Sequence, residues 1–314
     1  SKIKNQKSKC NSKCKMNIGK ILGKEDILRS KLFKFLEKYQ KPSIDAVAVT
    51  IGPGLEPCLW AGVNFAKALA YFWNLPIIPV NHIESHLLIN LLTQIDKNFQ
   101  KILPAIGLVA SGGHTELILI KNIGQYKIIG ETRDDAAGEC FDKTARILGL
   151  SYPGGPAIAA LAAKFKVKSS KLKVKLPRPM INTKNYDFSF SGLKTAVLYD
   201  YKKRSKKIRD SEEYKIKMAK EIQQSVIDVL ISKTIKAAKD YGIKSIILGG
   251  GVVANVALRL QLKVKSEKLK VKLLTPSKKL CTDNAAMVGI TASFHLRNRK
   301  IWKQIKACAN LSLF

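Results

Sequence analysis

The sequence lacks any apolar run near the roughly 20 residues that a membrane-spanning helix needs. Its lysine-rich N-terminal end also lacks the apolar stretch at the centre of a secretory signal peptide. These two absences argue against a membrane protein and against a secreted one. We therefore expect a soluble, cytoplasmic protein that has no membrane partner.

Cysteines show no repeated pairing. The six are scattered through 314 residues, unlike the dense cysteine framework of a small secreted protein. Cys10 and Cys14 form a C-x3-C pair that could bind a metal, but no second pair follows them. We interpret the cysteines as ordinary thiols of a protein in a reducing compartment.

Acidic residues are scarce. Only 23 Asp and Glu residues oppose 56 Lys and Arg residues, which gives a formal net charge of +33. This excess is far beyond what solubility requires, so we expect a polyanionic partner such as nucleic acid. Lysine greatly outnumbers arginine, and a biased genome composition is the alternative source of part of the excess.

Strands and helices alternate along the chain. After a lysine-rich arm over residues 1–20, without any acidic residue, the apolar spacing predicts an amphipathic helix at 25–40 and a long helix at about 214–240. Buried strands are predicted at 45–50, 77–80, 103–110 and 245–248. This alternation is typical of an α/β fold.

Two lysine-rich segments, 166–176 and 263–273, are near copies in which lysine alternates with Val or Leu. We interpret them as insertions, at 164–175 and 263–272, that form exposed hairpins whose charge protects an edge. Phosphate binding is the alternative function of these lysines.

Two of the four histidines, His82 and His86, are four residues apart after an apolar strand. On a helix, this spacing places both imidazoles on one face, about one turn apart, where they can bind one divalent ion. The alternative is that the two histidines belong to an ordinary polar helix face. A third metal ligand elsewhere in the chain would favour the metal site. Asp283, before a small-residue helix, is either that ligand or a helix cap.

The chain contains neither the P-loop pattern nor GxGxxG, but two glycine turns follow buried strands: ASGGH (110–114) and GGG (249–251). Glycine lets the backbone approach a phosphate closely, and a helix N-terminus adds partial positive charge. Two such turns in one α/β chain predict a nucleotide cleft between lobes. Asp142 either accepts hydrogen bonds from a ribose or caps a helix.

Several motifs occur together and in order: NHIESH (81–86), ASGGHTEL (110–117), DDAAGECFDKTARILGLSYPGGP (134–156), LPRPM (176–180), FSFSGLKTA (188–196), GGGVVAN (249–255) and CTDNAAMVG (281–289). On these motifs, over about residues 44–296, the chain resembles the bacterial tRNA adenosine threonylcarbamoyltransferases, the TsaD family. The resemblance implies an ASKHA fold, the two-lobed α/β architecture of actin, Hsp70 and sugar kinases, with a nucleotide cleft between the lobes.

The implied reaction transfers threonylcarbamoyl from threonylcarbamoyl-AMP to N6 of the adenosine 3′ of the anticodon, in tRNAs that read codons starting with A. The resemblance also implies one divalent metal ion, Fe2+ or Zn2+, and ATP, ADP or threonylcarbamoyl-AMP as nucleotide ligand. The expected partners are tRNA, a paralogous TsaB-like ASKHA subunit and a small TsaE-like ATPase.

The resemblance assigns two sets of site residues. The metal ligands correspond to His82, His86 and Asp283. The positions that hold the adenylate or nucleotide correspond to Ala110, Ser111, Gly112, Gly113, His114, Asp142, Gly155 and Asn255.

The chain departs from the family at its start, because the strand of the form GIETSCDDT and the later GGVVPE segment are both absent. The chain is then either a fragment or has a lobe completed in another way, which bears on full activity. We expect an arm and helix at 1–43 without the first ASKHA strand, the rest of the N-terminal lobe at 44–105, the C-terminal lobe at 106–296 and a tail at 297–314.

Two other functions are open. A non-catalytic ATP-binding scaffold of the same complex would fit the missing strand. A metalloprotease would use Glu84 beside the histidines, but in H-E-x-x-H the glutamate follows the first histidine directly, whereas here Ile83 does. The shift turns the carboxylate by about 100 degrees on a helix, which disfavours a protease.

Overall fold

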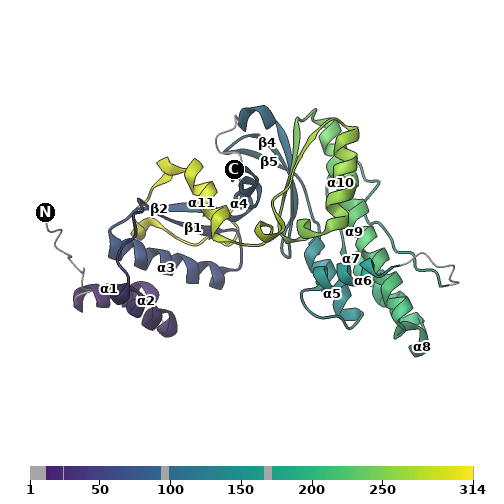
Figure 1. The fold of residues 1–314 in the computed structure, drawn as a ribbon, viewed down its shortest axis with the longest axis horizontal. Coiled ribbons are helices and arrows are strands. Elements are labelled where there is room, and N and C mark those ends of the chain that lie inside the picture. The colour runs from purple at the N-terminus through teal and green to yellow at the C-terminus, as the bar shows by residue number, and fades with distance from the viewer. Residues whose placement is uncertain (1–11, 24, 93–98, 166–171, 314) are drawn as a thin grey trace. The chain divides into compact units, whose positions relative to one another are not determined.

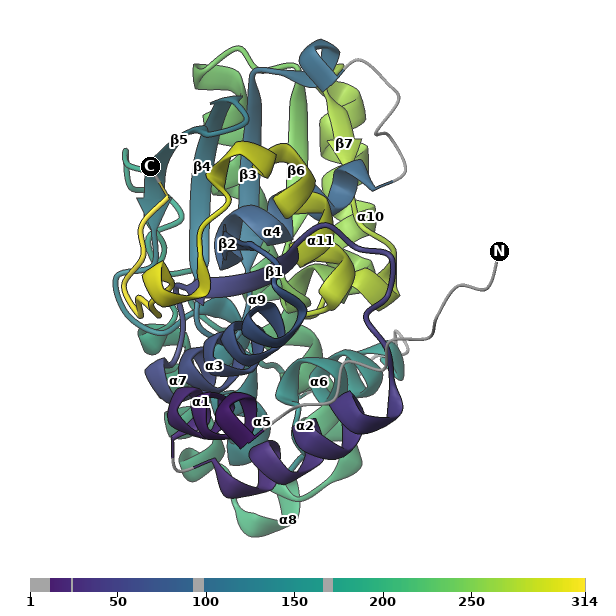
Figure 2. The ribbon, with the colours of Figure 1, turned by 90° about the vertical axis from the view of Figure 1, so that its left-hand side faces the viewer.

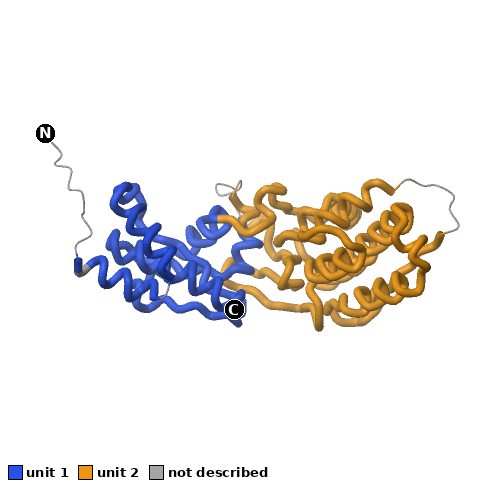
Figure 3. The backbone as a smooth tube through the Cα atoms, turned by 90° about the horizontal axis from the view of Figure 1, so that it is seen from below, with its two compact units in different colours: residues 1–88, 285–313 blue, residues 89–284, 314 orange. Residues whose placement is uncertain are grey.

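The computed structural model describes residues 12–23, 25–92, 99–165 and 172–313. The chain forms two compact units, residues 1–88 with 285–313 and residues 89–284 with 314 (Figure 3). The predicted α/β class is confirmed, because both units combine strands with covering helices (Figure 1).

The first unit contains a parallel pair of strands, β1 (Val47–Gly52) and β2 (Ile77–Asn81), joined by helix α3 (Glu56–Trp73). Buried residues of α3, such as Val63 and Ala66, pack with β1 and Ile77. Helix α11 (Ala285–Phe294) packs on β2 through Ala292. Helix α4 (His82–Leu88) follows β2 directly and contacts α11.

Two helices precede these strands, α1 (Ser12–Leu22) and α2 (Asp26–Lys38). The expected arm at 1–20, disordered or loosely attached, is wrong for the part that the structure describes. Ile18 in the arm and Leu22 just after it are both on α1 and fully buried against α2 and α3. Four residues separate the two, so they share one helix face, and this apolar spacing outweighs the lysine content. Residues 1–11 lie outside the described residues.

The C-terminal segment packs with the first unit, which differs from the expected tail at 297–314. Ile305 is only 2% exposed, and the N–H of Cys308 donates to the carbonyl of Ile51 at 2.7 Å. The unit boundary at residue 88 also differs from the expected division at 105, and α11 belongs to the first unit instead of the second. The chain therefore returns to the first unit after building the second.

The second unit is built on a five-stranded sheet in the order β5-β4-β3-β6-β7 (Figure 2). The strands are β3 (Ala105–Ala110), β4 (Thr115–Asn122), β5 (Gln125–Glu131), β6 (Ser245–Gly249) and β7 (Lys272–Leu274). β3 pairs with β4 in antiparallel orientation and with β6 in parallel orientation. The strands predicted at 103–110 and 245–248 are thus confirmed as β3 and β6.

Helices cover one face of this sheet (Figure 1). They are α5 (Ala137–Ile147), α6 (Gly154–Ala163), α7 (Ser191–Lys203), α9 (Glu212–Asp240) and α10 (Val256–Lys268). The short helix α8 (Lys206–Arg209) contacts α9 away from the sheet (Figure 1). Alternate strand residues such as Ile106, Leu117 and Leu248 join buried residues of α9 in one core. The long helix predicted at 214–240 is confirmed.

The two lysine-rich copies do not form matching hairpins. The second, 263–272, completes α10, turns, and enters β7, which pairs with β6. The predicted exposed hairpin is therefore wrong there, because Leu262 and Ser266 are buried at helical spacing. In the first copy, 166–171 lie outside the described residues and 172–175 form no regular element.

Candidate functional site

The histidine pair stands on a helix whose start is fixed by Asn81. The Asn81 side-chain oxygen accepts hydrogen bonds from the backbone N–H groups of Ile83 (2.9 Å) and Glu84 (3.2 Å). This is the capping role that asparagine performs before a helix. The rings of His82 and His86 then lie edge to face with centroids 4.7 Å apart, as the spacing predicts.

The third expected ligand reaches the same place. One ligand atom from each of His82, His86 and Asp283 lies within 4.8 Å of the others. Ligand atoms are about 2.0–2.2 Å from a zinc ion and surround it tetrahedrally, so two on one ion lie about 3.4 Å apart. The set fits one divalent ion after a small side-chain movement, and two imidazoles with a carboxylate suit zinc or iron.

Glu84, between the two histidines in sequence, has another partner. Nε2 of His295 lies 2.9 Å from both carboxylate oxygens of Glu84, and Glu84 is 5% exposed. This hydrogen bond raises the pKa of His295. A buried glutamate held in this way joins α4 to the end of α11, which disfavours its use as the general base of a protease.

The two glycine turns lie side by side at the carboxyl ends of β3 and β6. Val109 pairs with Gly249, and a Cβ on Gly250 would be 2.3 Å from the carbonyl oxygen of Ala110. Gly250 has a φ of +91°, so only glycine satisfies both the conformation and the space. Thr282, the neighbour of Asp283, lies beside Gly251.

The turn after β3 also meets the start of α5. The N–H of Gly138 donates to the carbonyl of Ser111 at 3.0 Å, and a Cβ on Gly138 would lie 2.5 Å from that oxygen. The backbone N–H of His114 donates to the Ser111 hydroxyl at 3.1 Å. Among the described residues, the N–H groups of Gly112 and Gly113 have no hydrogen-bond acceptor, and the space above both glycines is open.

The other predicted nucleotide residues have contacts within the protein. A carboxylate oxygen of Asp142 accepts from the N–H of Gly154 at 2.6 Å, at the start of α6. Gly155 lies in the first turn of α6, with open space at its Cβ position. Asn255 caps α10 by accepting from Leu258 N at 3.1 Å. Asp142, inside α5, thus contacts the first residue of α6, and its role toward a ribose stays a prediction, as it does for Asn255.

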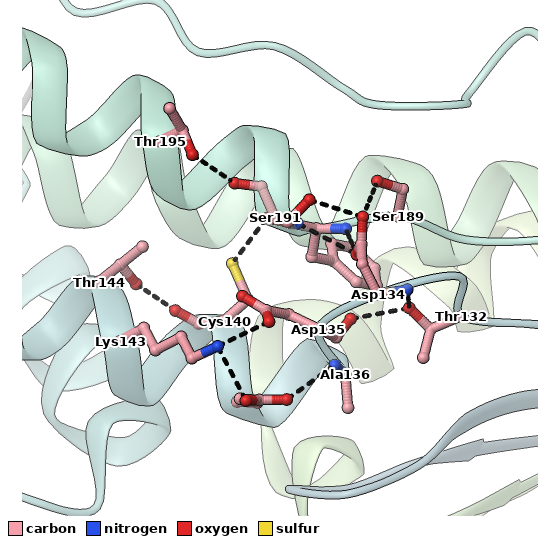
Figure 4. Close-up of polar contacts among 12 residues, drawn as sticks. Thr132, Asp134, Asp135, Ala136, Cys140, Lys143, Thr144, Ser189, Ser191 and Thr195 are labelled. Carbon is pink, nitrogen blue, oxygen red and sulfur yellow. Dashed lines mark hydrogen bonds and ion pairs between the residues drawn. The ribbon is translucent and has the colours of Figure 1, made fainter.

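Asp134 joins two motifs that sequence reasoning did not connect. Figure 4 shows its carboxylate accepting from the hydroxyls of Ser189 and Ser191, both at 2.6 Å. The backbone N–H groups of Phe190 and Ser191 donate to it as well, at 2.8 and 3.1 Å. Burial opposes ionisation, but these hydrogen bonds together lower the pKa of Asp134. Asp134 thereby fixes the start of α7 against the segment before α5.

The neighbouring Cys140 is not a reactive thiol. It is fully buried, and burial followed by the charges of Asp135 and Asp134 raises its pKa to about 12. Its Sγ donates to the carbonyl of Phe190 at 3.7 Å (Figure 4). Because the thiolate is the nucleophile, this cysteine has a packing role.

The sequence model of the family "TsaD: tRNA N6-adenosine threonylcarbamoyltransferase" matches residues 31–290. The chain belongs to this family. The tRNA N6-adenosine threonylcarbamoyltransferase of Syntrophomonas wolfei is 48% identical over 257 residues, which cover 82% of this chain and 73% of the relative. The enzyme of the same name from Thermosipho africanus is 44% identical over 272 residues, 86% of this chain and 78% of the relative.

Membership of the threonylcarbamoyltransferase family confirms the resemblance inferred from the motifs. It also confirms the predicted activity, transfer of a threonylcarbamoyl group that modifies tRNA, and the enzyme class, a transferase. The scaffold and protease alternatives are not favoured.

Solved structures share the fold. Full-length HypF in the phosphate- and nucleotide-bound form aligns with a TM-score of 0.58 at 16% identity, covering 88% of this chain and 50% of that one. HypF of T. kodakarensis gives the same TM-score at 12% identity, covering 88% and 43%. The predicted nucleotide cleft between two ASKHA lobes stays a prediction.

In the part of the chain that the structure describes, no helix has the length and apolar character needed to cross a membrane.

Proposed function

We propose that this transferase takes threonylcarbamoyl from threonylcarbamoyl-AMP and places it on N6 of the adenosine 3′ of the anticodon, in tRNAs that read codons starting with A. His82, His86 and Asp283 hold one divalent ion in this proposal, Fe2+ or Zn2+. The observation that carries it is the convergence of these three side chains from positions about 200 residues apart, in a chain of the TsaD family.

The ion, when bound, supplies Lewis-acid polarisation of an oxygen of the substrate. The protein positions that ion through α4, because Asn81 fixes the first turn and the Glu84–His295 contact fixes the helix against α11. His86 is 2% exposed, so its ring has little freedom to turn away. Rigid support of this kind is what keeps ligands in place for binding.

The adenylate is proposed to bind at the paired glycine turns. The N–H groups of Gly112 and Gly113 are suited to a phosphate oxygen, because each points from a turn without a Cβ and has no acceptor among the described residues. Ala110, Ser111 and His114 shape this turn. Asp142, Gly155 and Asn255 are proposed to contact the rest of the nucleotide, which is ATP, ADP or threonylcarbamoyl-AMP.

The transfer reaction then depends mainly on how the enzyme positions its two substrates. Adenine N6 is a weak nucleophile, and its attack on the carbamoyl carbonyl forms a C–N bond while the bond to AMP breaks and a proton leaves N6. AMP is a good leaving group, so holding both substrates in line supplies much of the rate. Since the substrate is tRNA, we place the reaction in the cytoplasm, with TsaB-like and TsaE-like partner subunits.

The test combines the purified protein, its partner subunits, threonylcarbamoyl-AMP and unmodified tRNA. We expect the wild type to form threonylcarbamoyladenosine and to retain metal. Asp283→Ala is expected to lower bound metal and turnover by at least about 100-fold, since a carboxylate ligand is lost. Asp45→Ala, at another exposed aspartate, is the control and should match the wild type.

Full metal retention and normal turnover in Asp283→Ala would contradict the metal assignment. Nucleotide binding by the wild type without any tRNA product, even with partners and metal present, would contradict the proposed reaction and support the scaffold alternative.

A further inference from the structure

The most basic stretch of the described chain joins α7 to α8. Six of the eight residues 202–209 (KKRSKKIR) are Lys or Arg, and none is acidic. The four lysines among them, Lys202, Lys203, Lys206 and Lys207, are exposed and have no ion-pair partner among the described residues. In Figures 1 and 2 this stretch lies at the end of α9 where α8 is labelled.

An exposed aromatic ring accompanies these lysines. Tyr199 is 67% exposed. Lys202 and Lys203 follow it by three and four residues on α7, so all three side chains share one helix face. The surface therefore presents cations next to a flat ring that is open to solvent.

The two arginines of the stretch hold it in place. Arg204 binds the carboxylate of Asp200 through Nε (3.2 Å) and Nη2 (3.0 Å), and Asp200 also accepts from the hydroxyl of Tyr214 at 2.9 Å. The guanidinium of Arg209 lies 5.2 Å from the ring centroid of Tyr201. The carboxylate of Asp200 is thus engaged, and the four lysines are exposed to solvent beside it.

The described end of the first lysine-rich copy, residues 172–175, reaches the same surface. Nη2 of Arg204 donates to the backbone carbonyl of Lys173 at 3.0 Å, and Nζ of Lys217 donates to that of Leu172 at 2.9 Å. Lys173 and Lys175 are both exposed. Their charges add to those of α7 and α8.

We propose that this surface, formed by Tyr199, Lys202, Lys203, Lys206 and Lys207 with Lys173 and Lys175 beside them, binds the phosphate backbone of the tRNA substrate. The inference rests on the proposed function, which makes tRNA the substrate. Lysines bind phosphates as compact charges and release condensed counterions, and an exposed ring stacks on an unpaired base. An acidic protein is the competing partner, but it would not need the exposed ring.

The second lysine-rich copy differs and supplies a matched control. There Lys263 is 3.9 Å from Glu267, and the exposed lysines lie beside an exposed apolar stripe that includes Leu260 and Val264. The test variant changes Lys202, Lys203, Lys206 and Lys207 to Gln. The control variant changes Lys265, Lys268, Lys270 and Lys272 to Gln, which removes the same number of charges from the same unit.

Binding of unmodified tRNA is measured over a KCl series, and threonylcarbamoyl transfer is measured with partners present. For the test variant, we expect Kd and KM for tRNA to rise about tenfold or more at about 150 mM KCl. The slope of log affinity against log salt should become shallower by about 3, since each lost phosphate contact removes about 0.7–0.9. The kcat at saturating tRNA should not change, and the control should stay within about twofold.

Tyr199→Ala is the second variant, and it should weaken tRNA binding without changing the salt slope, because stacking releases no counterion. Unchanged Kd and slope in the quadruple variant would overturn the proposal, as would an equal loss in the control. Loss of partner-subunit association with unchanged tRNA binding would assign the surface to a protein. Because Kd is measured directly, a wild type that binds tRNA without modifying it counts against the proposed function and not against this surface.

Discussion

Glu116 has a partly buried carboxylate whose ionisation the fold opposes. It lies on β4 directly opposite Glu131 of β5, and burial followed by the Glu131 charge raises the pKa of Glu116 to about 7 from 4.5. Its Oε2 atom is buried and has no hydrogen-bond partner among the described residues. A charged Glu116 is therefore unfavourable in the folded state.

This pKa predicts how stability depends on pH. The folded state holds a proton on Glu116 that the unfolded state loses near pH 4.5. The contribution of Glu116 to the free energy of unfolding should therefore fall as pH rises from about 4.5 to 7 and then level off. Glu116→Gln should remove this fall and be more stable than wild type at pH 8 by about 1–3 kcal/mol, with little difference at pH 4. Urea unfolding of both proteins at several pH values measures the free energy of unfolding.

Glu25→Gln, at an exposed glutamate, is the control for Glu116→Gln and should follow the wild type at every pH. An unchanged pH profile in Glu116→Gln would show that this carboxylate is not the source of the fall.

The paired turns at the ends of β3 and β6 are the structural element that brings the nucleotide motifs together. In these turns, main chain packs directly on main chain: Gly250 contacts Ala110, and Gly138 contacts Ser111. A side chain at either glycine must displace a strand end or a helix start, because the atoms in contact are main chain.

Gly250→Ala should therefore be strongly destabilising. Its φ of +91° is strained for alanine, and the new Cβ would lie 2.3 Å from the Ala110 oxygen. We expect a loss of about 2–5 kcal/mol in the free energy of unfolding. Gly124→Ala is the matched control, because Gly124 has a φ of +76° with open space around it and should cost only about 1–2 kcal/mol. Equal losses in the two variants would contradict the close approach.

Charge governs the behaviour of the whole molecule. The 314 residues carry a net charge of +33, and like charges repel one another. The repulsion is stronger in the folded state, because the charges lie closer together there than in the unfolded chain. Few acidic groups are present to offset it, and several of them, such as Asp134, are already engaged within the protein. Salt should screen this repulsion, because the Debye length falls from about 30 Å at 0.01 M to about 8 Å at 0.15 M.

Thermal unfolding of nucleic-acid-free protein should thus shift upward by several degrees between about 0.01 and 0.15 M KCl. Circular dichroism follows the transition, and NaCl in place of KCl controls for effects of the particular cation. A midpoint that falls or stays constant with added salt would show that the repulsion is balanced within the fold.

The sequence alone determined the features that are encoded locally. Helical spacing predicts α9 and the placement of His82 and His86 on one face, and long contiguous motifs predict the family. The same local reasoning was wrong where packing decided: Ile18 and Leu22 are buried in a lysine-rich segment, and the second lysine-rich copy became helix and strand. Charge alternation gives no information on which neighbour a segment will contact.

Only the tertiary structure decided which distant residues meet. Asp134 receives two hydroxyls from more than 50 residues away, Glu84 meets His295, and Arg204 donates to the carbonyl of Lys173. The sequence of each element does not predict these contacts, because the packing of whole helices and strands determines which elements become neighbours. The fold therefore supplies the surroundings of the site, while local spacing and motifs identify its chemistry.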